Sequence, residues 1–136
     1  MAYADGRLFV PVVDLCSRGS AIGYTPLEQT NPSTGRGELV ALDAANGRHL
    51  WTTRFPQPPF GCATVGDGVV FVSTFDGDLY GLDARTGARL WTSRMRAGIN
   101  ACPALAGGFL LVGAGVRLGR KSVLELVAYA ARQTAD

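Results

Sequence analysis

The side chains with the greatest chemical capacity in this 136-residue sequence are three cysteines, Cys16, Cys62 and Cys102. Because three is an odd number, at least one thiol has no disulfide partner within the chain. None of them belongs to the C-x-x-C pairs that are typical of structural zinc sites, so zinc binding is not predicted. The single histidine, His49, has no cysteine or carboxylate at ligand spacing, and we expect it to face solvent.

An internal repeat determines where these residues must lie. Residues 37–55 recur as residues 77–95, and ten of the 19 aligned positions are identical. The same offset of 40 aligns Cys62 with Cys102 and residues 69–72 with residues 109–112. Within each unit, short apolar runs alternate with glycine-rich turns. This pattern indicates four β-strands per unit and is typical of a β-propeller blade.

The repeat predicts an all-β fold of about three consecutive four-stranded antiparallel blades. Strands are expected near residues 7–13, 39–43, 48–54, 62–65, 69–73, 79–83, 88–94, 109–113 and 124–129. We expect residues 1–136 to form one partial propeller, with blades over 1–58, 59–97 and 98–130 and a tail over 131–136. The first blade contains a 22-residue insertion near 14–36, and the third lacks its fourth strand. Because four blades of this period need about 160 residues, the chain is predicted to form an open, incomplete propeller.

Three residue types recur as the structural motif of the repeat. Each aspartate ends a strand, where its carboxylate can accept backbone N–H groups of the following turn. Each glycine is expected in the left-handed conformation that closes a hairpin loop. Each tryptophan is expected to be buried at the junction with a neighbouring blade, the alternative being an aromatic shelf for a ligand. The motif residues are Asp43, Gly47, Trp51, Asp83, Gly87 and Trp91.

The composition argues against several other classes of protein. Hydrophobic residues make up 47% and charged residues 18%, which favours an ordered globular fold. The net charge of +2, without a long basic block, does not predict nucleic-acid binding. No apolar stretch has the length of a membrane span, and the first residues lack the basic and apolar regions of a signal peptide.

The motif Leu-Asp-Ala-x-x-Gly-x-x-Leu-Trp, at residues 42–51 and 82–91, resembles the repeat of pyrroloquinoline-quinone (PQQ)-like propellers, the quinoprotein alcohol dehydrogenase-like family. The resemblance implies a C-terminal fragment of a longer, secreted or periplasmic bacterial propeller. It implies as partners the remaining blades of that parent, or another protein chain. Some members of the family hold PQQ and calcium, whereas others are non-catalytic and bind proteins. We expect no cofactor in this chain, and PQQ and calcium only if the parent is a dehydrogenase.

In each blade, the direction of the strands places the connection between the second and third strands on one face of the propeller. The start of the first strand lies on the same face. The resemblance implies that a cofactor would lie on such a face, near the propeller axis. It makes Asp14 and Asp76 candidates for a base and Asn100 a candidate for a metal ligand, while Arg18 in the insertion could bind an anion. The alternatives are a turn cap for an aspartate and a decorated loop for the insertion. No catalytic or metal-binding residue is predicted beyond these candidates.

The repeat also brings two cysteines together. Cys62 and Cys102 hold the same repeat position, so we expect them at one height on adjacent blades, where a disulfide can form. Cys16 is the alternative partner for either, and three free thiols are the third possibility.

The sequence thus predicts a non-catalytic binding or scaffold module of a larger secreted propeller protein. One alternative is a fragment of a PQQ-dependent alcohol or sugar dehydrogenase. Another is a truncated product without an independent function.

Overall fold

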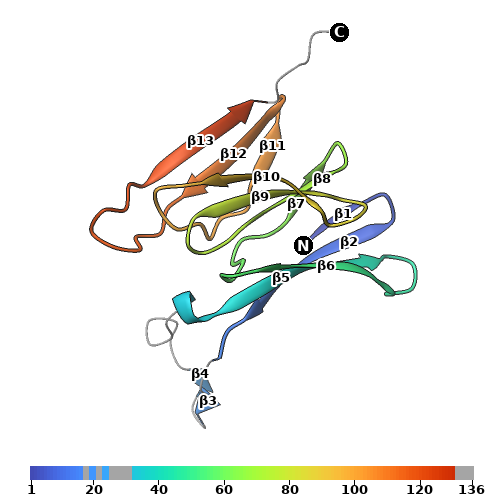
Figure 1. The fold of residues 1–136 in the computed structure, drawn as a ribbon, viewed down its shortest axis with the longest axis horizontal. Coiled ribbons are helices and arrows are strands. Elements are labelled where there is room, and N and C mark those ends of the chain that lie inside the picture. The colour runs from blue at the N-terminus through green and yellow to red at the C-terminus, as the bar shows by residue number, and fades with distance from the viewer. Residues whose placement is uncertain (17–18, 21–22, 25–31, 131–136) are drawn as a thin grey trace.

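The computed structural model describes residues 1–16, 19–20, 23–24 and 32–130 of the chain. Three antiparallel sheets follow one another along the sequence (Figure 1). The described residues contain no α-helix, and their only helical element is the 3-10 turn η2 (Pro32–Thr34). The predicted all-β fold of consecutive, open blades is confirmed. Within the described part of the chain, no helix is long and apolar enough to cross a membrane.

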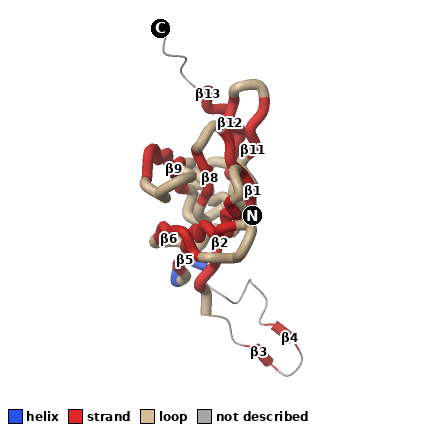
Figure 2. The backbone as a smooth tube through the Cα atoms, turned by 90° about the vertical axis from the view of Figure 1, so that its right-hand side faces the viewer, coloured by secondary structure: helices blue, strands red, loops and turns tan. Residues whose placement is uncertain are grey.

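The first blade has the strand order β1-β2-β5-β6. Its strands are β1 (Ala2–Ala4), β2 (Arg7–Asp14), β5 (Arg36–Asp43) and β6 (His49–Phe55). The insertion lies between β2 and β5. It contains a short hairpin of β3 (Gly19–Ser20) and β4 (Gly23–Tyr24), which projects away from the three main sheets (Figure 2).

The second blade repeats this meander with β7 (Thr64–Gly66), β8 (Val69–Ser73), β9 (Asp78–Asp83) and β10 (Arg89–Arg94).

The third blade has three strands in the described residues: β11 (Ala104–Ala106), β12 (Phe109–Ala114) and β13 (Glu125–Ala130). Two of the short strands, β1 and β11, were not among those predicted. Both are rich in alanine, which has a low β-propensity, so their sequences give little local signal.

Glycine and aspartate form the turns within each blade. The first hairpins of blades one and two contain Asp5-Gly6 and Asp67-Gly68, and all four residues have positive φ, between 48° and 73°. A two-residue turn of this type matches the twist of the strands that it joins. In the last hairpin of the second blade, the Asp83 carboxylate accepts hydrogen bonds from the backbone N–H groups of the turn. Its bonds with Thr86 hold the pKa of Asp83 below its ordinary value.

The core consists of two apolar layers, one between each pair of successive blades. The layer between blades one and two is formed by Phe9, Leu39, Ala41, Trp51, Phe55, Ala63, Val70, Val72, Tyr80, Leu82 and Ala84. The layer between blades two and three is formed by Leu79, Met95, Ala97, Ile99, Leu110, Val112 and Ala114. Along β9, neighbouring side chains enter different layers, since successive residues of a strand point to opposite faces. The second blade therefore contributes side chains to both layers.

Candidate functional site

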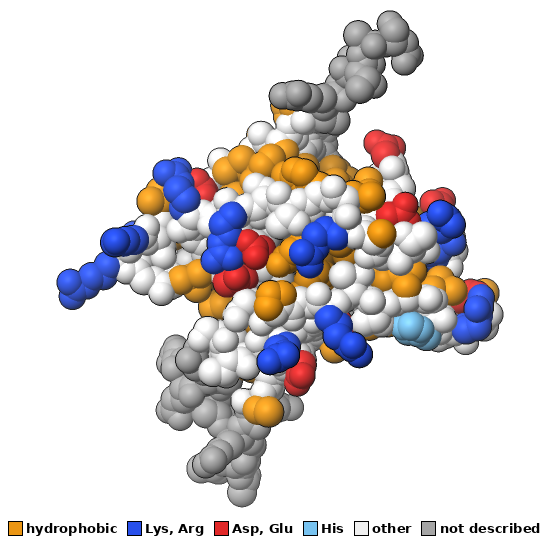
Figure 3. Space-filling model, viewed as in Figure 1, with side chains coloured by type: hydrophobic (Ala, Val, Ile, Leu, Met, Phe, Trp, Pro, Cys, Tyr) orange, Lys and Arg blue, Asp and Glu red, His pale blue; other side chains and the backbone are white. Residues whose placement is uncertain are grey.

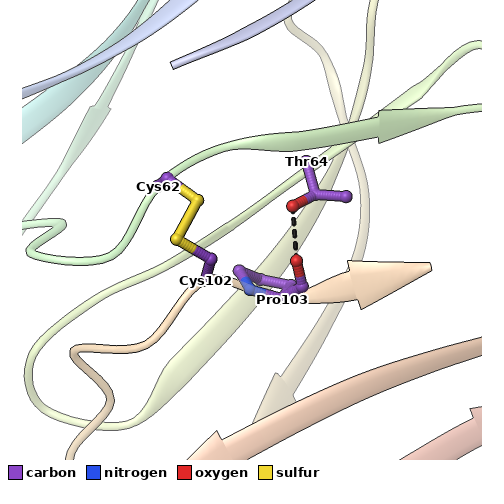
Figure 4. The surroundings of a disulfide bond; sticks show 4 residues. All are labelled: Cys62, Thr64, Cys102 and Pro103. Carbon is purple, nitrogen blue, oxygen red and sulfur yellow. Dashed lines mark hydrogen bonds between the residues drawn. A yellow bond between two sulfur atoms is a disulfide. The ribbon is translucent and has the colours of Figure 1, made fainter.

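A disulfide joins Cys62 and Cys102, which precede the equivalent strands β7 and β11 (Figure 4). Their Cα atoms are 4.7 Å apart, within the range that a disulfide needs. The Thr64 hydroxyl donates a hydrogen bond to the Pro103 carbonyl beside the bridge (Figure 4). A Cβ at Gly61 would lie 2.5 Å from the Ala101 carbonyl oxygen, so a glycine is needed where the two segments approach. The second and third blades are therefore linked covalently at their inner strands.

Cys16 lies beyond the end of β2 and is an exposed, free cysteine. It is not the partner of either bridged cysteine.

Asp76, in the turn between β8 and β9, is bonded through both carboxylate oxygens. The Thr74 hydroxyl donates to Oδ1 at 2.7 Å, and Arg94 donates to Oδ2 at 2.7 Å. The same Arg94 nitrogen lies 2.9 Å from Oδ1 of Asp78. The hydrogen bond with Asp78, and then that with Asp76, raises the pKa of Arg94. Asp76 therefore anchors its turn to β10, as a structural residue does.

Tyr80 belongs to the same group of side chains. Its hydroxyl donates to Oδ2 of Asp78 at 3.1 Å, and the Arg89 guanidinium lies 4.7 Å from the centre of its ring. Burial, followed by the negative charge of Asp78, raises the pKa of Tyr80 to about 12. The phenol is thus protonated and bonded at neutral pH.

The remaining polar candidates do not gather into one site. Asp14 is exposed at the end of β2, where it pairs in the sheet with Arg36. Asn100 is exposed in the connection between β10 and β11, beside a shallow depression. Arg18 lies outside the described residues.

These residues do not fit calcium or a quinone as a set of ligands. The carboxylate of Asp76 is already bonded to Thr74 and Arg94. Among the residues that the structure describes, no group of three His, Cys, Asp or Glu side chains could hold a metal ion.

An apolar groove of 710 Å³ lies between the second and third blades. Hydrophobic side chains gather on this part of the surface, over the region of β10 to β12 (Figure 3). Leu90 and Trp91 of β10 line the groove and are 59% and 37% exposed. The other large side chains that line it are Val65, Val69, Phe71, Leu105, Phe109, Leu110 and Tyr129.

The groove corrects one prediction, that Trp51 and Trp91 are buried equivalently. Trp51 is only 8% exposed, because the last hairpin of the second blade covers its ring. The equivalent hairpin of a third blade would follow Ala130 and is not among the described residues. The sequence carried a signal of this difference, since Ala130 stands where the motif has aspartate and no Gly-x-x-x-Trp follows.

The fold and these sites define the chain as an open segment of a β-propeller with PQQ-like repeats. The family model described as outer membrane protein assembly factor BamB matches residues 2–132, and the chain belongs to this family. A search of curated protein sequences gave no match.

Solved structures with similar folds include enzymes and an assembly factor. A quinohemoprotein alcohol dehydrogenase from Pseudomonas putida superposes with a TM-score of 0.62 at 20% identity, over 82% of this chain and 20% of that chain. A europium-containing methanol dehydrogenase gives 0.62 at 22% identity, over 82% and 23%. BamB from Moraxella catarrhalis gives 0.51 at 28% identity, over 62% and 26%. The chain therefore spans about a fifth to a quarter of the length of these proteins.

Proposed function

We propose that this chain is a non-catalytic binding or scaffold module, part of a larger propeller that engages other polypeptides. The observation that carries the proposal is the groove between blades two and three, where large apolar side chains remain exposed. Contiguous apolar surface of this kind is characteristic of sites that bind other molecules. The family match to an outer membrane assembly factor agrees with a protein as the bound molecule.

The polar residues support the same function. Asp76 and Asp78 are neutralised by Arg94, and Glu125 is paired with Arg96. Such pairs stabilise turns and strand ends, and they occupy these three carboxylates with arginine. We therefore propose that the chain itself carries no quinone and no calcium ion.

We further propose that the protein acts in a secreted or periplasmic compartment. Disulfides persist in oxidising compartments and are rare in the cytosol. The bridge between Cys62 and Cys102 connects two blades and is part of the architecture. The family's description as an outer membrane assembly factor is consistent with that location.

Site-specific crosslinking tests the proposed function. The chain, exported to a bacterial periplasm, carries a photoreactive amino acid at Leu90 in the groove or, as a control, at the exposed His49 on the first blade. We expect one discrete polypeptide adduct from position 90 and none from position 49. Equal labelling at both positions, or none at position 90, would contradict a binding role for this surface.

The alternative is a fragment of a PQQ-dependent dehydrogenase. The similarity in fold to a quinohemoprotein alcohol dehydrogenase and a methanol dehydrogenase supports this alternative. Calorimetric titration of the folded chain with PQQ, in the presence of calcium, distinguishes the two functions. We expect no saturable heat of binding and no oxidation of alcohols with an artificial electron acceptor. Saturable binding of PQQ would favour the enzyme.

A further inference from the structure

The long connection between β12 and β13 combines positive charge with exposed apolar side chains. Residues 115–124 form this basic loop, which contains no acidic residue. Its three basic residues, Arg117, Arg120 and Lys121, are all exposed. Within the part of the chain that the structure describes, no carboxylate forms an ion pair with any of the three. Glu125, at the base of the loop, is already paired with Arg96, so it does not neutralise them.

Aliphatic side chains are interspersed with these charges. Leu118 and Leu124 are each 46% exposed, and Val123 is 43% exposed. The stems of arginine and lysine can extend along apolar surface while their charged ends reach polar groups. Exposed apolar side chains that are bordered by cations are characteristic of segments that bind at the surface of an anionic lipid bilayer.

The backbone groups at the tip of the basic loop are bonded within the loop. The Ser122 hydroxyl accepts hydrogen bonds from the backbone N–H groups of Leu118 at 2.9 Å and Gly119 at 3.1 Å. The backbone N–H of Ser122 donates to the Gly119 carbonyl at 3.1 Å. Removing an unbonded backbone group from water is costly. These bonds therefore lower the cost of moving the tip from water to a lipid interface.

Further contacts fix the basic loop to the rest of the third blade. Gly98 and Val116 exchange two backbone hydrogen bonds, of 2.8 and 3.0 Å, and the backbone N–H of Val123 donates to the Arg96 carbonyl at 3.2 Å. A Cβ at Gly98 would lie 3.1 Å from Cδ2 of Leu118, so that side chain rests against residue 98. The loop is therefore held in one arrangement, which reduces the entropy that it would lose on binding.

The basic loop protrudes from one side of the molecule. It lies on the left of Figure 1, where Lys and Arg side chains form the edge of the surface in Figure 3. The hairpins β5–β6 and β9–β10 lie on the opposite side (Figure 1). No residue of the loop lines the groove between blades two and three. The loop is therefore a separate surface from the groove.

We propose that the basic loop binds the surface of an anionic lipid bilayer and holds the third blade against a membrane. Its cations contact phosphate groups of the lipids, and its exposed aliphatic side chains enter the boundary between headgroups and acyl chains. Binding of this kind is peripheral and reversible. It goes beyond the proposed function, because it assigns a second surface and a second class of partner.

The shape of the loop favours a bilayer over an acidic polypeptide. A protruding tip cannot enclose a polypeptide, whereas fluid lipid headgroups rearrange around it. An acidic polypeptide would neutralise the cations but would leave the aliphatic side chains in water. A bilayer has an anionic layer for the cations and an apolar layer for the aliphatic side chains.

Co-sedimentation with lipid vesicles tests the role of the charges. The chain should bind vesicles of phosphatidylglycerol and phosphatidylethanolamine but not vesicles of phosphatidylcholine alone. Arg120→Gln/Lys121→Gln should weaken this binding by about tenfold or more, and so should salt at about 0.5 M. Arg48→Gln/Arg85→Gln removes the same charge from exposed positions in the hairpins on the opposite side, and it should leave binding nearly unchanged.

A matched pair of valine variants tests the apolar contribution. Val123→Asn should weaken vesicle binding by about fivefold or more, because it replaces exposed apolar surface of the loop. Val12→Asn makes the same change on the first blade, at a side chain that is 37% exposed, and should leave binding unchanged. Circular dichroism and urea melts establish that all variants are folded.

A fluorescent label identifies the segment that meets the lipid. A Cβ at Gly119 meets no atom within 4 Å, so Gly119→Cys in a Cys16→Ser background accepts a nitrobenzoxadiazole label without a steric conflict. Its emission should shift to shorter wavelength when anionic vesicles are added, because the tip leaves water. The same label on His49→Cys, in the same background, should not shift, since His49 is exposed on the opposite side.

Absence of binding to anionic vesicles, or binding without an emission shift at position 119, would overturn the proposal. Equal weakening by the two double variants would show that net charge alone drives binding and would also overturn it. Binding of polyglutamate through Arg120 and Lys121, without vesicle binding, would assign the loop to an acidic polypeptide instead. None of these results bears on the groove, whose binding function is tested separately by crosslinking at position 90.

Discussion

Two tryptophans at equivalent repeat positions differ in what they contribute to stability. Trp51 is 8% exposed and packs against Phe9 and the last hairpin of the second blade, whereas Trp91 is 37% exposed. We expect Trp51→Ala to lower the free energy of unfolding by roughly 3–5 kcal/mol. Trp91→Ala should cost on the order of 1–2 kcal/mol, because its ring buries less surface.

Urea melts followed by circular dichroism measure both values, with His49→Ala as the control. His49 is exposed and its ring contacts the Thr52 hydroxyl at 2.8 Å, so its removal should have little effect. Equal losses for the two tryptophan variants would show that Trp91 is covered in solution.

Glu125 makes the free energy of unfolding depend on pH in acidic solution. Its carboxylate accepts hydrogen bonds from the side chain and backbone N–H of Arg96, which hold its pKa below the ordinary value. A carboxyl group whose pKa is lower in the folded state than in the unfolded state stabilises the fold at pH values above its unfolded-state pKa. This contribution is lost as the pH falls below the ordinary pKa of glutamate, about 4.3, and through the lower folded-state pKa.

The urea midpoint of the wild-type chain should therefore exceed that of Glu125→Gln at pH 7, and the difference should shrink as the pH is lowered below about 4.3, the ordinary pKa of glutamate. Glu38→Gln, at the equivalent position of the first blade, is the matched control. Its carboxylate lies 3.7 Å from Nε of an exposed arginine, so we expect a smaller difference at neutral pH. A difference for Glu125→Gln that is independent of pH would contradict the role of this pairing.

At the scale of structural elements, the disulfide links the starts of β7 and β11 across 40 residues. A crosslink of this span lowers the entropy of the unfolded chain and stabilises a protein by about 2–4 kcal/mol. The double variant Cys62→Ser/Cys102→Ser should lose about this much stability in a urea melt. Cys16→Ser should match the wild type, since Cys16 is exposed and unbridged. Three alkylated thiols in the non-reduced protein would refute the bridge.

Repeat periodicity explains how much of the architecture was predictable. An offset of 40 located the longer strands, and β8 (Val69–Ser73) was predicted to the residue. The same offset placed Cys62 and Cys102 at equivalent positions, although it left their pairing open. The repeat implied a first strand in the first and third blades but gave no bounds for β1 and β11, because three-residue segments carry little local propensity.

The sequence carried only an indirect signal of the groove, the alanine at position 130, because the shape of the groove depends on tertiary contacts. Trp91 has the same local motif as Trp51, so the local sequence predicts the same burial for both. Only the arrangement of blades shows which hairpin covers which tryptophan. Likewise, the pairing of Asp76 with Arg94 joins two segments that the sequence alone does not place in contact. The candidate base at Asp76 therefore became a structural residue.

At the scale of the whole molecule, the blades form a row in which each contacts only its neighbours along the chain. The connection between β12 and β13 lies on the left of Figure 1, and the hairpins β5–β6 and β9–β10 lie on the right. The two apolar layers give the middle blade two neighbours and each outer blade one. Stability in such a row is approximately a sum over blades and over the interfaces between them.

This arrangement has a consequence for the order in which the molecule opens. Local unfolding starts where a cooperative unit has the fewest buried contacts, and native-state amide exchange measures the free energy of each opening. The exchange rates should therefore be slowest in β8 and β9, where Val70, Val72 and Leu82 are fully buried. They should be faster in β2 and β5 and fastest in β13, whose outer edge is unpaired in the described structure. Uniform rates across the three blades would instead indicate that the row opens as a single cooperative unit.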